Sequence, residues 1–345
     1  MLTIGIPTYN RKNELSELLD NLLKEIKDAN LDNSKIEILI SDNASSDGTP
    51  ELVYEYIKKY PDFINYYRNE SNLGYDKNVN NVGKKAKYEY VLFMSDDDMF
   101  EDGSLKKIVT YLEDNTVDII LMKEKFYDES NSINISYMKD EAYRNIAHDE
   151  FYKNGKDLME NTRKVFVAIS GFLIKKDLWN SLNYTDYEDC WFIQTYAMLQ
   201  VFPYSSVFIF GEPMIKYRLN IKKDSLIKPY MKIFEVPFGL LKIIKSIKGK
   251  YSKELYEEVY NKELSWSRRL MIGCKSREYI NNKLEVYQWM KKTYDTDKLS
   301  FWILDVPLLY IPDILFKIPY LIYRIYKYKV FHTNKVISTK DMKHT

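Results

Sequence analysis

Short apolar runs alternate with amphipathic segments along the first third of the chain. Lys12–Ala29 places its leucines at helical spacing, which predicts a helix with one buried face. The strands expected from apolar runs are Leu2–Pro7, Lys35–Ile40, Phe63–Arg68, Tyr90–Met94 and Val117–Leu121. The helices expected between them are Lys12–Ala29, Pro50–Lys59, Asn78–Ala86 and Ser104–Glu113. Strands that alternate with helices indicate an α/β fold with a mainly parallel central sheet flanked by helices.

The pattern resumes after a polar stretch, Asp128–Glu150, which we expect to form a loop over a site. The elements predicted beyond it are the strand Val165–Ile174, the helices Lys176–Ser181 and Asp189–Gln200, and the strand Val207–Phe210. After Asn220 the sequence becomes basic, aromatic and mostly helical in pattern. We therefore expect an α/β domain in residues 1–220 and an α-helical C-terminal extension in residues 221–345.

Composition and charge narrow the class of protein. The 345 residues are 45% hydrophobic and 29% charged, which excludes a disordered or collagen-like chain. The net charge of +1 argues against a nucleic-acid binder. Residues 226–345 contain 23 basic and 12 acidic residues, whereas residues 1–225 contain 28 and 38. This asymmetry suggests two tasks, one of which involves an anionic surface.

Two cysteines do not support a disulfide framework, so a reducing compartment is expected. The first residues, MLTIGIPTYNRKNE, show no basic leader followed by an apolar stretch. No segment offers about 20 consecutive apolar residues. These features predict a cytoplasmic protein without a membrane span.

Three adjacent carboxylates, Asp96, Asp97 and Asp98, follow the apolar run Tyr90–Met94 and the residue Ser95. In an open α/β sheet, ligands bind at the carboxyl ends of the strands. Carboxylate oxygens suit Mn²⁺ or Mg²⁺, which one or two carboxylates hold together with substrate phosphates. The alternative is an acidic, solvated surface turn.

The ends of the first two predicted strands should lie at the same edge. Pro7, Thr8 and Tyr9 would then form a wall for a flat base, and Asp42 would accept a hydrogen bond from a ring N–H. Taken alone, an aspartate at the position of Asp42 is more often a turn residue.

These motifs resemble those of the family-2 glycosyltransferases with the GT-A fold, a Rossmann-like arrangement. The resemblance covers residues 1–220 and depends on four segments: Ile6–Arg11, Ile40–Thr49, Asn72–Gly74 and Ser95–Asp98. It implies a nucleoside-diphosphate-sugar donor and a divalent metal ion, Mn²⁺ or Mg²⁺. It also implies that Asp42 contacts the base and Asp96 the ribose region, while Asp97 and Asp98 are the candidate metal ligands. Many members have Asp where this chain has Ser95, which leaves the division of tasks among the three carboxylates open.

The same resemblance places further residues in donor binding, namely Asn10, Asn72 and Gly74. Relatives carry Arg-Asn where this chain has Asn80-Asn81, so Lys77 is a candidate substitute cation for the diphosphate. The alternative is an exposed helix lysine. Arg218, which follows the last predicted strand of the domain, is a further candidate diphosphate ligand.

Asp186, Glu188 and Asp189 precede a predicted helix. Inverting transfer by single displacement needs a carboxylate within hydrogen-bond reach of the acceptor hydroxyl. Relatives place a Glu-Asp pair at such a helix start, which favours Asp189 as the base, with Glu188 and Asp186 as substitutes. The alternative is that Asp186 or Asp189 caps the helix.

Aromatic and basic residues mix in Phe301–Val330, a composition suited to a membrane–water interface. Pro307, Pro312 and Pro319 interrupt the segment, so it should not span a bilayer. Residues 221–345 are therefore interpreted as a helical cap, as the interface of a homo-oligomer, or as a peripheral membrane contact through residues 301–330 at the inner face of the cell membrane.

Together these features predict a metal-dependent, inverting glycosyltransferase. It would move a sugar from a nucleotide donor, UDP-linked, to a glycan or lipid-linked acceptor in surface polysaccharide synthesis such as that of a capsule. Sugar-nucleotide synthesis is disfavoured because no glycine-rich loop follows the first strand. The remaining alternative is a non-catalytic glycan-binding or scaffold protein on the same fold.

Overall fold

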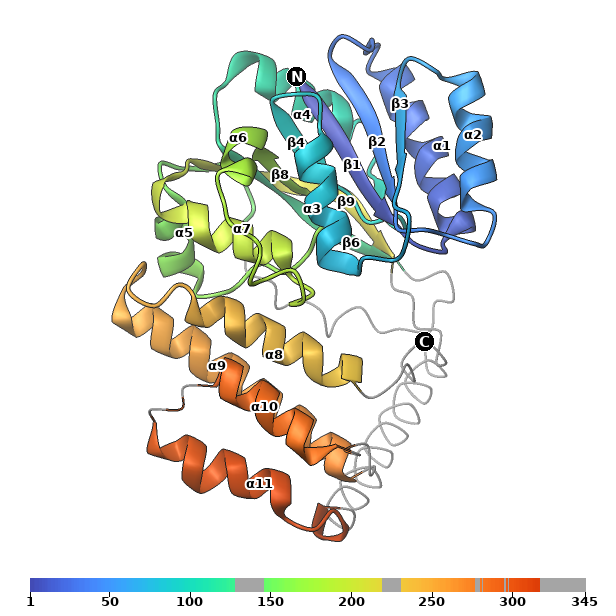
Figure 1. Ribbon diagram of the computed structural model, residues 1–345. Coiled ribbons are helices and arrows are strands. Elements are labelled where there is room, and N and C mark those ends of the chain that lie inside the picture. Colours follow the sequence, from blue (N-terminus) through green and yellow to red (C-terminus); the bar gives the residue numbers. More distant parts are fainter. Residues whose placement is uncertain are drawn as a thin grey trace, which may run out of the picture. The chain divides into compact units, whose positions relative to one another are not determined.

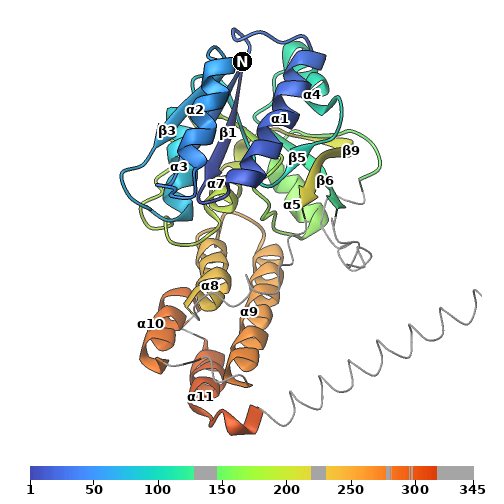
Figure 2. The ribbon, with the colours of Figure 1, turned by 90° about the vertical axis from the view of Figure 1, so that its right-hand side faces the viewer.

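The computed structural model describes residues 1–127, 146–218, 231–276, 280, 282–294, 296 and 298–316 (Figure 1, Figure 2). The chain divides into two compact units. An α/β unit comprises residues 1–225 and 243–259, and a helical unit comprises residues 226–242 and 260–345. The predicted boundary near residue 221 falls in a stretch outside the described residues and stays a prediction.

A nine-stranded mixed sheet forms the centre of the α/β unit. Its strands are β1 (Leu2–Thr8), β2 (Ile36–Asp42), β3 (Ile64–Arg68), β4 (Tyr90–Phe93), β5 (Met99–Phe100), β6 (Ile119–Tyr127), β7 (Glu150–Tyr152), β8 (Phe172–Lys175) and β9 (Val207–Arg218). They lie in the order β3-β2-β1-β4-β8-β6-β9-β5, and β7 pairs with β9. The first four strands of this order are parallel, and β8 runs antiparallel between β4 and β6. The parallel half brings the carboxyl ends of β1, β2 and β4 to one edge.

Helices cover both faces of this sheet (Figure 1). They are α1 (Lys12–Asp28), α2 (Thr49–Lys59), α3 (Tyr75–Lys85), α4 (Ser104–Asp114), α5 (Gly155–Thr162), α6 (Lys176–Asn180) and α7 (Ile193–Val201). The leucines of α1 and the apolar side of α4 pack with the side chains of Leu2, Ile4 and Ile6 in one buried cluster. This burial explains the helical spacing seen in the sequence.

Helix α3 packs against the opposite face at unusually short range. A Cβ added to Gly5 of β1 would lie 2.1 Å from Cγ1 of Val82 in α3. A Cβ added to Gly83 would lie 2.2 Å from Nε1 of Trp179 in α6. Only glycine permits these approaches, and they fix α3 between β1 and α6.

Several boundaries differ from the predicted ones. Strand β8 begins at Phe172, not Val165, and α7 begins at Ile193, not Asp189. Strand β9 continues to Arg218 instead of ending at Phe210. Gly211, Glu212 and Pro213 interrupt its apolar pattern, but a register shift against β6 keeps the two strands paired.

The helical unit and its junctions contain α8 (Met231–Lys245), α9 (Lys253–Ser276), α10 (Lys283–Thr293), a π-helical turn (Phe301–Asp305) and α11 (Val306–Tyr310). The prediction of a helical C-terminal extension is confirmed. Within the part of the chain that the structure describes, no helix has the length and apolar character needed to cross a membrane.

Candidate active site

The ends of β1, β2 and β4 converge at one edge of the sheet. Thr8 lies beside Asp42 in the register of β1 and β2. The hydroxyl of Thr8 donates a hydrogen bond to Oδ2 of Asp96 at 2.8 Å, and Asp96 follows β4. The structure therefore brings together three of the four predicted motif segments, which are distant in sequence.

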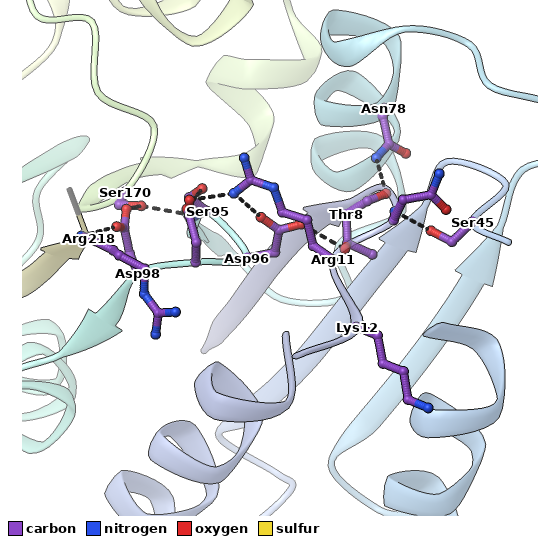
Figure 3. Close-up of polar contacts among 12 residues, drawn as sticks. Thr8, Arg11, Lys12, Ser45, Asn78, Ser95, Asp96, Asp98, Ser170 and Arg218 are labelled. Atoms are coloured by element: carbon purple, nitrogen blue, oxygen red, sulfur yellow. Dashed lines mark hydrogen bonds and ion pairs between the residues drawn. The ribbon is translucent and has the colours of Figure 1, made fainter. Parts of the chain in front are cut away.

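The adjacent carboxylates have different partners, as Figure 3 shows for Asp96 and Asp98. Asp96 accepts from Thr8 and lies 3.2 Å from Nη1 of Arg11. The same guanidinium pairs with Asp97. Asp98 accepts from Oγ of Ser170 at 2.5 Å and from the backbone N–H of Arg218 at 2.9 Å. Asp98 thus ties the end of β9 to the cluster, while Asp96 and Asp97 share a cation.

Burial strongly affects the ionisation of this cluster. Desolvation raises the pKa of Asp96 to about 7, with Arg11 lowering it and Asp97 raising it further. Desolvation also raises the pKa of Asp98 to about 7, helped by the charge of Asp97. Carboxylates in this state favour a nearby cation, because a cation restores the charged form.

The carboxylates of Asp96 and Asp97 could bind a divalent ion together with a substrate. Arg11 already places a positive group against both Asp96 and Asp97. Among the described residues, no group of three His, Cys, Asp or Glu side chains could hold a metal ion by itself. Mg²⁺-type ions are commonly bound by one or two carboxylates plus substrate phosphates, which matches this open arrangement.

Arg11 was absent from the predicted site residues. It belongs to the motif Ile6–Arg11, but a lone arginine before a helix carries no sequence signal that it faces carboxylates about 85 residues later. Desolvation opposes its charge, yet Asp96 and Asp97 raise its pKa overall.

Asp42 is fully buried at the end of β2. Its Oδ1 accepts from the backbone N–H of Ser45 at 2.9 Å, and its Oδ2 accepts from the hydroxyl of Tyr66 at 2.6 Å. Nε of Arg68 lies 3.5 Å from the same Oδ2. Desolvation first, and then this hydrogen bond, raise the pKa of Tyr66. Asp42 is therefore held in one orientation by polar groups of the neighbouring loop and strand.

The loop after β1 is clasped to the loop after β2 by Asn10, which adopts a positive φ of 52°. Its N–H donates to Oγ of Ser45 at 2.9 Å, and its Oδ1 accepts from the N–H of Ser46 at 2.8 Å. The side chain of Tyr9 is 44% exposed beside the buried Thr8, while Pro7 is half-buried. The predicted wall for a base thus consists of a buried Thr8, a half-buried Pro7 and an exposed Tyr9.

A network of asparagines holds the predicted motif segment Asn72–Gly74. Oδ1 of Asn72 accepts from Nδ2 of Asn43 at 2.8 Å and from the N–H of Gly74 at 2.9 Å. Asn69 and Asn78 extend the network to Ser41 and to the carbonyl of Thr8. Asn43, Asn69 and Asn78 were absent from the predicted site residues, because asparagines near strand ends are common and their partners lie far along the chain.

The acidic loop before α7 lies against α3. The Glu188 carboxylate accepts from Nδ2 of Asn80 at 3.1 Å and lies 4.0 Å from Nζ of Lys77. Asp186 and Asp189 are exposed. The structure therefore brings Lys77 and Glu188 together, and it leaves Asp189 exposed.

Neither Asp186 nor Asp189 caps α7. The residue at the N-cap is Phe192, and the N–H of Ile193 donates instead to Asp76 of α3 at 3.0 Å. Asp76 also accepts from the N–H of Trp191 at 2.6 Å. The capping explanation of these two acidic residues is therefore wrong, and Asp76 satisfies the helix start.

Asp76 was also absent from the predicted site. It is buried, and desolvation raises its pKa to about 7 despite the backbone N–H groups that it accepts. The charge of Asp189 also raises it. Trp191, with a positive φ of 66°, stacks on Tyr75 with ring centroids 6.0 Å apart. Asp76 and Tyr75 together fix the loop that carries Glu188 and Asp189.

Arg218 lies in the same cluster but is largely buried. Its Nε donates to the hydroxyl of Tyr127 at 2.7 Å, and its guanidinium pairs with Glu17. Its role as a diphosphate ligand stays a prediction.

Comparisons with known proteins identify relatives of this chain. A family model described as glycosyl transferase family 2 matches residues 3–180. The abequosyltransferase RfbV of Salmonella typhimurium is 31% identical over 282 residues, which cover 77% of this chain and 81% of that protein. The poly(ribitol-phosphate) β-N-acetylglucosaminyltransferase TarS of Staphylococcus aureus is 30% identical over 124 residues, covering 36% of this chain and 21% of TarS.

Two solved structures share the fold. TarS 1–349 of S. aureus in complex with UDP-GlcNAc aligns with a TM-score of 0.59 at 18% identity, covering 84% of this chain and 79% of that one. The mannosyltransferase PcManGT of Pyrobaculum calidifontis, in complex with GDP-Man and Mn²⁺, aligns with a TM-score of 0.53 at 15% identity, covering 92% and 86%. These likenesses confirm the predicted GT-A fold.

Proposed function

The chain belongs to glycosyl transferase family 2 and is a glycosyltransferase. On this premise we propose that it transfers a sugar from a UDP-linked donor to a glycan or lipid-linked acceptor, with inversion, in surface polysaccharide synthesis. The observation that carries the proposal is the convergence of Thr8, Asp42 and Asp96 at one sheet edge.

In this proposal the base of the donor lies against Pro7, Thr8 and Tyr9. Asp42 accepts its ring N–H, and Asp96 contacts the ribose region beside Thr8. The asparagine network holds Asn72 and Gly74 at the entrance, while Asn10 keeps the two loops together. The UDP-GlcNAc in the TarS structure supports a uridine donor.

Asp97 is the favoured metal ligand. Its carboxylate is 14% exposed, whereas Asp98 is buried with hydrogen bonds from Ser170 and Arg218. A bound Mn²⁺ or Mg²⁺ would supply positive charge to the departing diphosphate. Arg11 would release Asp97 as the ion and the diphosphate bind, and Lys77 and Arg218 are the further cations proposed for the diphosphate. The Mn²⁺ in the PcManGT structure supports this use of a metal.

Asp189 is the proposed catalytic base. Asp189 is exposed on a loop that Asp76 holds, and its Oδ1 accepts from Sγ of Cys190 at 3.7 Å. Glu188 is less exposed and accepts from Asn80. Asp189 takes the proton from the acceptor hydroxyl as that oxygen forms a bond to C1 of the donor sugar. The bond between C1 and the phosphate oxygen breaks, and its electron pair leaves with the nucleoside diphosphate. Attack from the side opposite the leaving group inverts the configuration at C1.

The test is a screen of donor hydrolysis across UDP-, GDP-, CDP- and dTDP-sugars with Mn²⁺, Mg²⁺ or EDTA. We expect turnover of a UDP-sugar that EDTA abolishes, and metal-dependent UDP binding by calorimetry. Asp97→Asn should lose the metal dependence of binding, whereas Asp102→Asn, at an exposed carboxylate of the same unit, should behave as the unmodified protein. Metal-independent binding or turnover would overturn the metal assignment, and turnover of another nucleotide sugar alone would overturn the UDP assignment.

A further inference from the structure

Large apolar side chains are exposed at high density in one segment of the helical unit, residues 299–315. Its exposed members are Leu299, Trp302, Ile303, Leu304, Tyr310, Ile311, Ile314 and Leu315. The exposed large apolar residues of the α/β unit are instead scattered, and most are tyrosines. Exposed apolar side chains gathered in one short segment indicate an interaction site.

The charged residues of the same segment face inward. Asp305 is 1% exposed and pairs with Arg268 of α9, with Nη2 of Arg268 at 2.7 Å from Oδ2. Asp313 pairs with Lys275 of α9 at 2.6 Å, and Lys275 is 0% exposed. Nζ of Lys275 also donates to the carbonyl of Leu309 at 2.9 Å. Both carboxylates of the segment are thus engaged by α9, while most of its large apolar side chains are exposed.

These ion pairs keep the apolar side outward. Turning the segment to bury Ile303 and Leu304 would separate Asp305 from Arg268 and break an ion pair whose carboxylate is buried. Removing one partner of a buried pair is strongly destabilising. The exposure is therefore built into the fold by two anchors, one on either side of α11.

The chemistry of the surface matches a bilayer interface. Trp302 and Tyr310 are the aromatic types that favour the headgroup level, and they stand among aliphatic side chains that favour the acyl region. Asp305 and Asp313 are the only charged residues between Leu299 and Phe316. The sequence that follows, residues 317–345, contains seven Lys or Arg and one acidic residue. Such basic flanks complement anionic headgroups.

We propose that residues 299–315 form a lipid-docking surface, which inserts the side chains of Trp302, Ile303 and Leu304 into the interface of an anionic bilayer without crossing it. The adjoining basic sequence supplies the electrostatic attraction. The inference is separate from the transfer reaction, because none of these residues belongs to the candidate active site.

The test is flotation of the full chain with vesicles of phosphatidylcholine alone and with added phosphatidylglycerol. We expect binding to the anionic vesicles and weaker binding to the neutral ones. The double variant I303S/L304S removes apolar area at exposed positions without changing charge, and it should reduce partitioning at least about tenfold. Leu284→Ser is the matched control, because Leu284 is 63% exposed on α10 of the same unit.

The outcomes separate lipid from other occupants. Unchanged partitioning of I303S/L304S, or no binding of the unmodified chain to anionic vesicles, would overturn the proposal. A dimer in light scattering that I303S/L304S dissociates, without vesicle binding, would assign the surface to a second copy instead. Thermal unfolding shows whether the variant is folded, and should it unfold, Trp302→Ser replaces it with the same expected loss. Donor hydrolysis should be equal in the unmodified chain, I303S/L304S and Leu284→Ser. A failure of the proposed reaction can therefore be distinguished from a failure of vesicle binding.

Discussion

The α/β unit and the helical unit both bury charged side chains, and the partners of those side chains differ. In the helical unit, Asp305 and Lys275 each have an oppositely charged partner, Arg268 and Asp313. In the α/β unit, Asp76 and Asp98 are satisfied by N–H and O–H donors, and burial raises the pKa of each to about 7. A buried ion pair stabilises one packing arrangement of the helices that carry it. A buried carboxylate with a pKa near 7 can instead change its protonation state when a cation or a substrate binds.

The largest expected effect is at the acceptor side. Asp189→Asn should reduce transfer on the order of 10³-fold, because an amide cannot take the acceptor proton. Donor binding measured by calorimetry should stay unchanged. Steady-state rates with Asp186→Asn as the control decide the assignment. A normal rate for Asp189→Asn, together with a loss in Asp186→Asn, would move the base to Asp186.

The second effect concerns the paired charges of the helical unit. Arg268→Met should lower the free energy of unfolding by about 3 kcal/mol, because it strands Asp305 in the interior. Denaturant unfolding of the variant, with the exposed neighbour Arg269→Met as control, measures the loss. Adding Asp305→Leu should recover much of it, since an apolar pair of similar volume can replace a buried ion pair. If the double variant is no more stable than Arg268→Met, the ion pair contributes more to stability than an apolar pair can replace.

The third effect is at the helix start that positions the proposed base. Asp76→Asn loses an acceptor for the N–H groups of Trp191 and Ile193, so the loop with Asp189 should shift. We expect kcat to fall about tenfold, a size typical of a disturbed orientation, with donor affinity unchanged. Asp177→Asn, in the first turn of α6, is the control. An equal loss of donor affinity would mean that Asp76 acts on the whole edge and not on this loop.

The same residue predicts a pH dependence of stability. The folded pKa of Asp76 is raised to about 7, above that of an unfolded Asp near 3.9. The folded state therefore holds more protons between about pH 4 and pH 7, and the free energy of unfolding falls as the pH rises through this range. Asp76→Asn should make that fall shallower, by up to about 1 kcal/mol per pH unit. Equal slopes in urea unfolding would contradict the raised pKa.

The outline of the fold was predictable from sequence because local patterns report local burial. The apolar runs of β1, β2 and β4 are buried on both faces, so their strands and their shared edge follow from composition alone. The extent of β9 was not predictable. Gly211, Glu212 and Pro213 interrupt its apolar pattern, and only the pairing with β6 across a register shift keeps the strand continuous.

The grouping of residues in the candidate site was predictable where adjacent residues suggest their own chemistry, and not where it depends on a distant partner. Adjacent carboxylates at a strand end indicated Asp96–Asp98 directly. Arg11 and Asp76 could not be found, because an arginine and an aspartate near helix starts are common, and their partners lie about 85 and 115 positions away. Only the folded chain relates Asp76 to the start of α7.

The smallest expected effect tests a charge that is not buried. Lys77 is half exposed, and its Nζ lies 4.0 Å from Glu188. An exposed ion pair contributes at most about 1 kcal/mol, so Lys77→Met should raise the KM for the donor about threefold if the lysine assists the diphosphate. Lys84→Met removes the same charge from an exposed position of α3 and serves as the control. A rise in the KM for the acceptor, with the donor KM unchanged, would instead assign Lys77 to Glu188 and the acceptor loop. Neither substitution is expected to disturb the fold, since both lysines are exposed. The difference in KM between the two variants therefore measures what the solvated charge of Lys77 contributes to substrate binding.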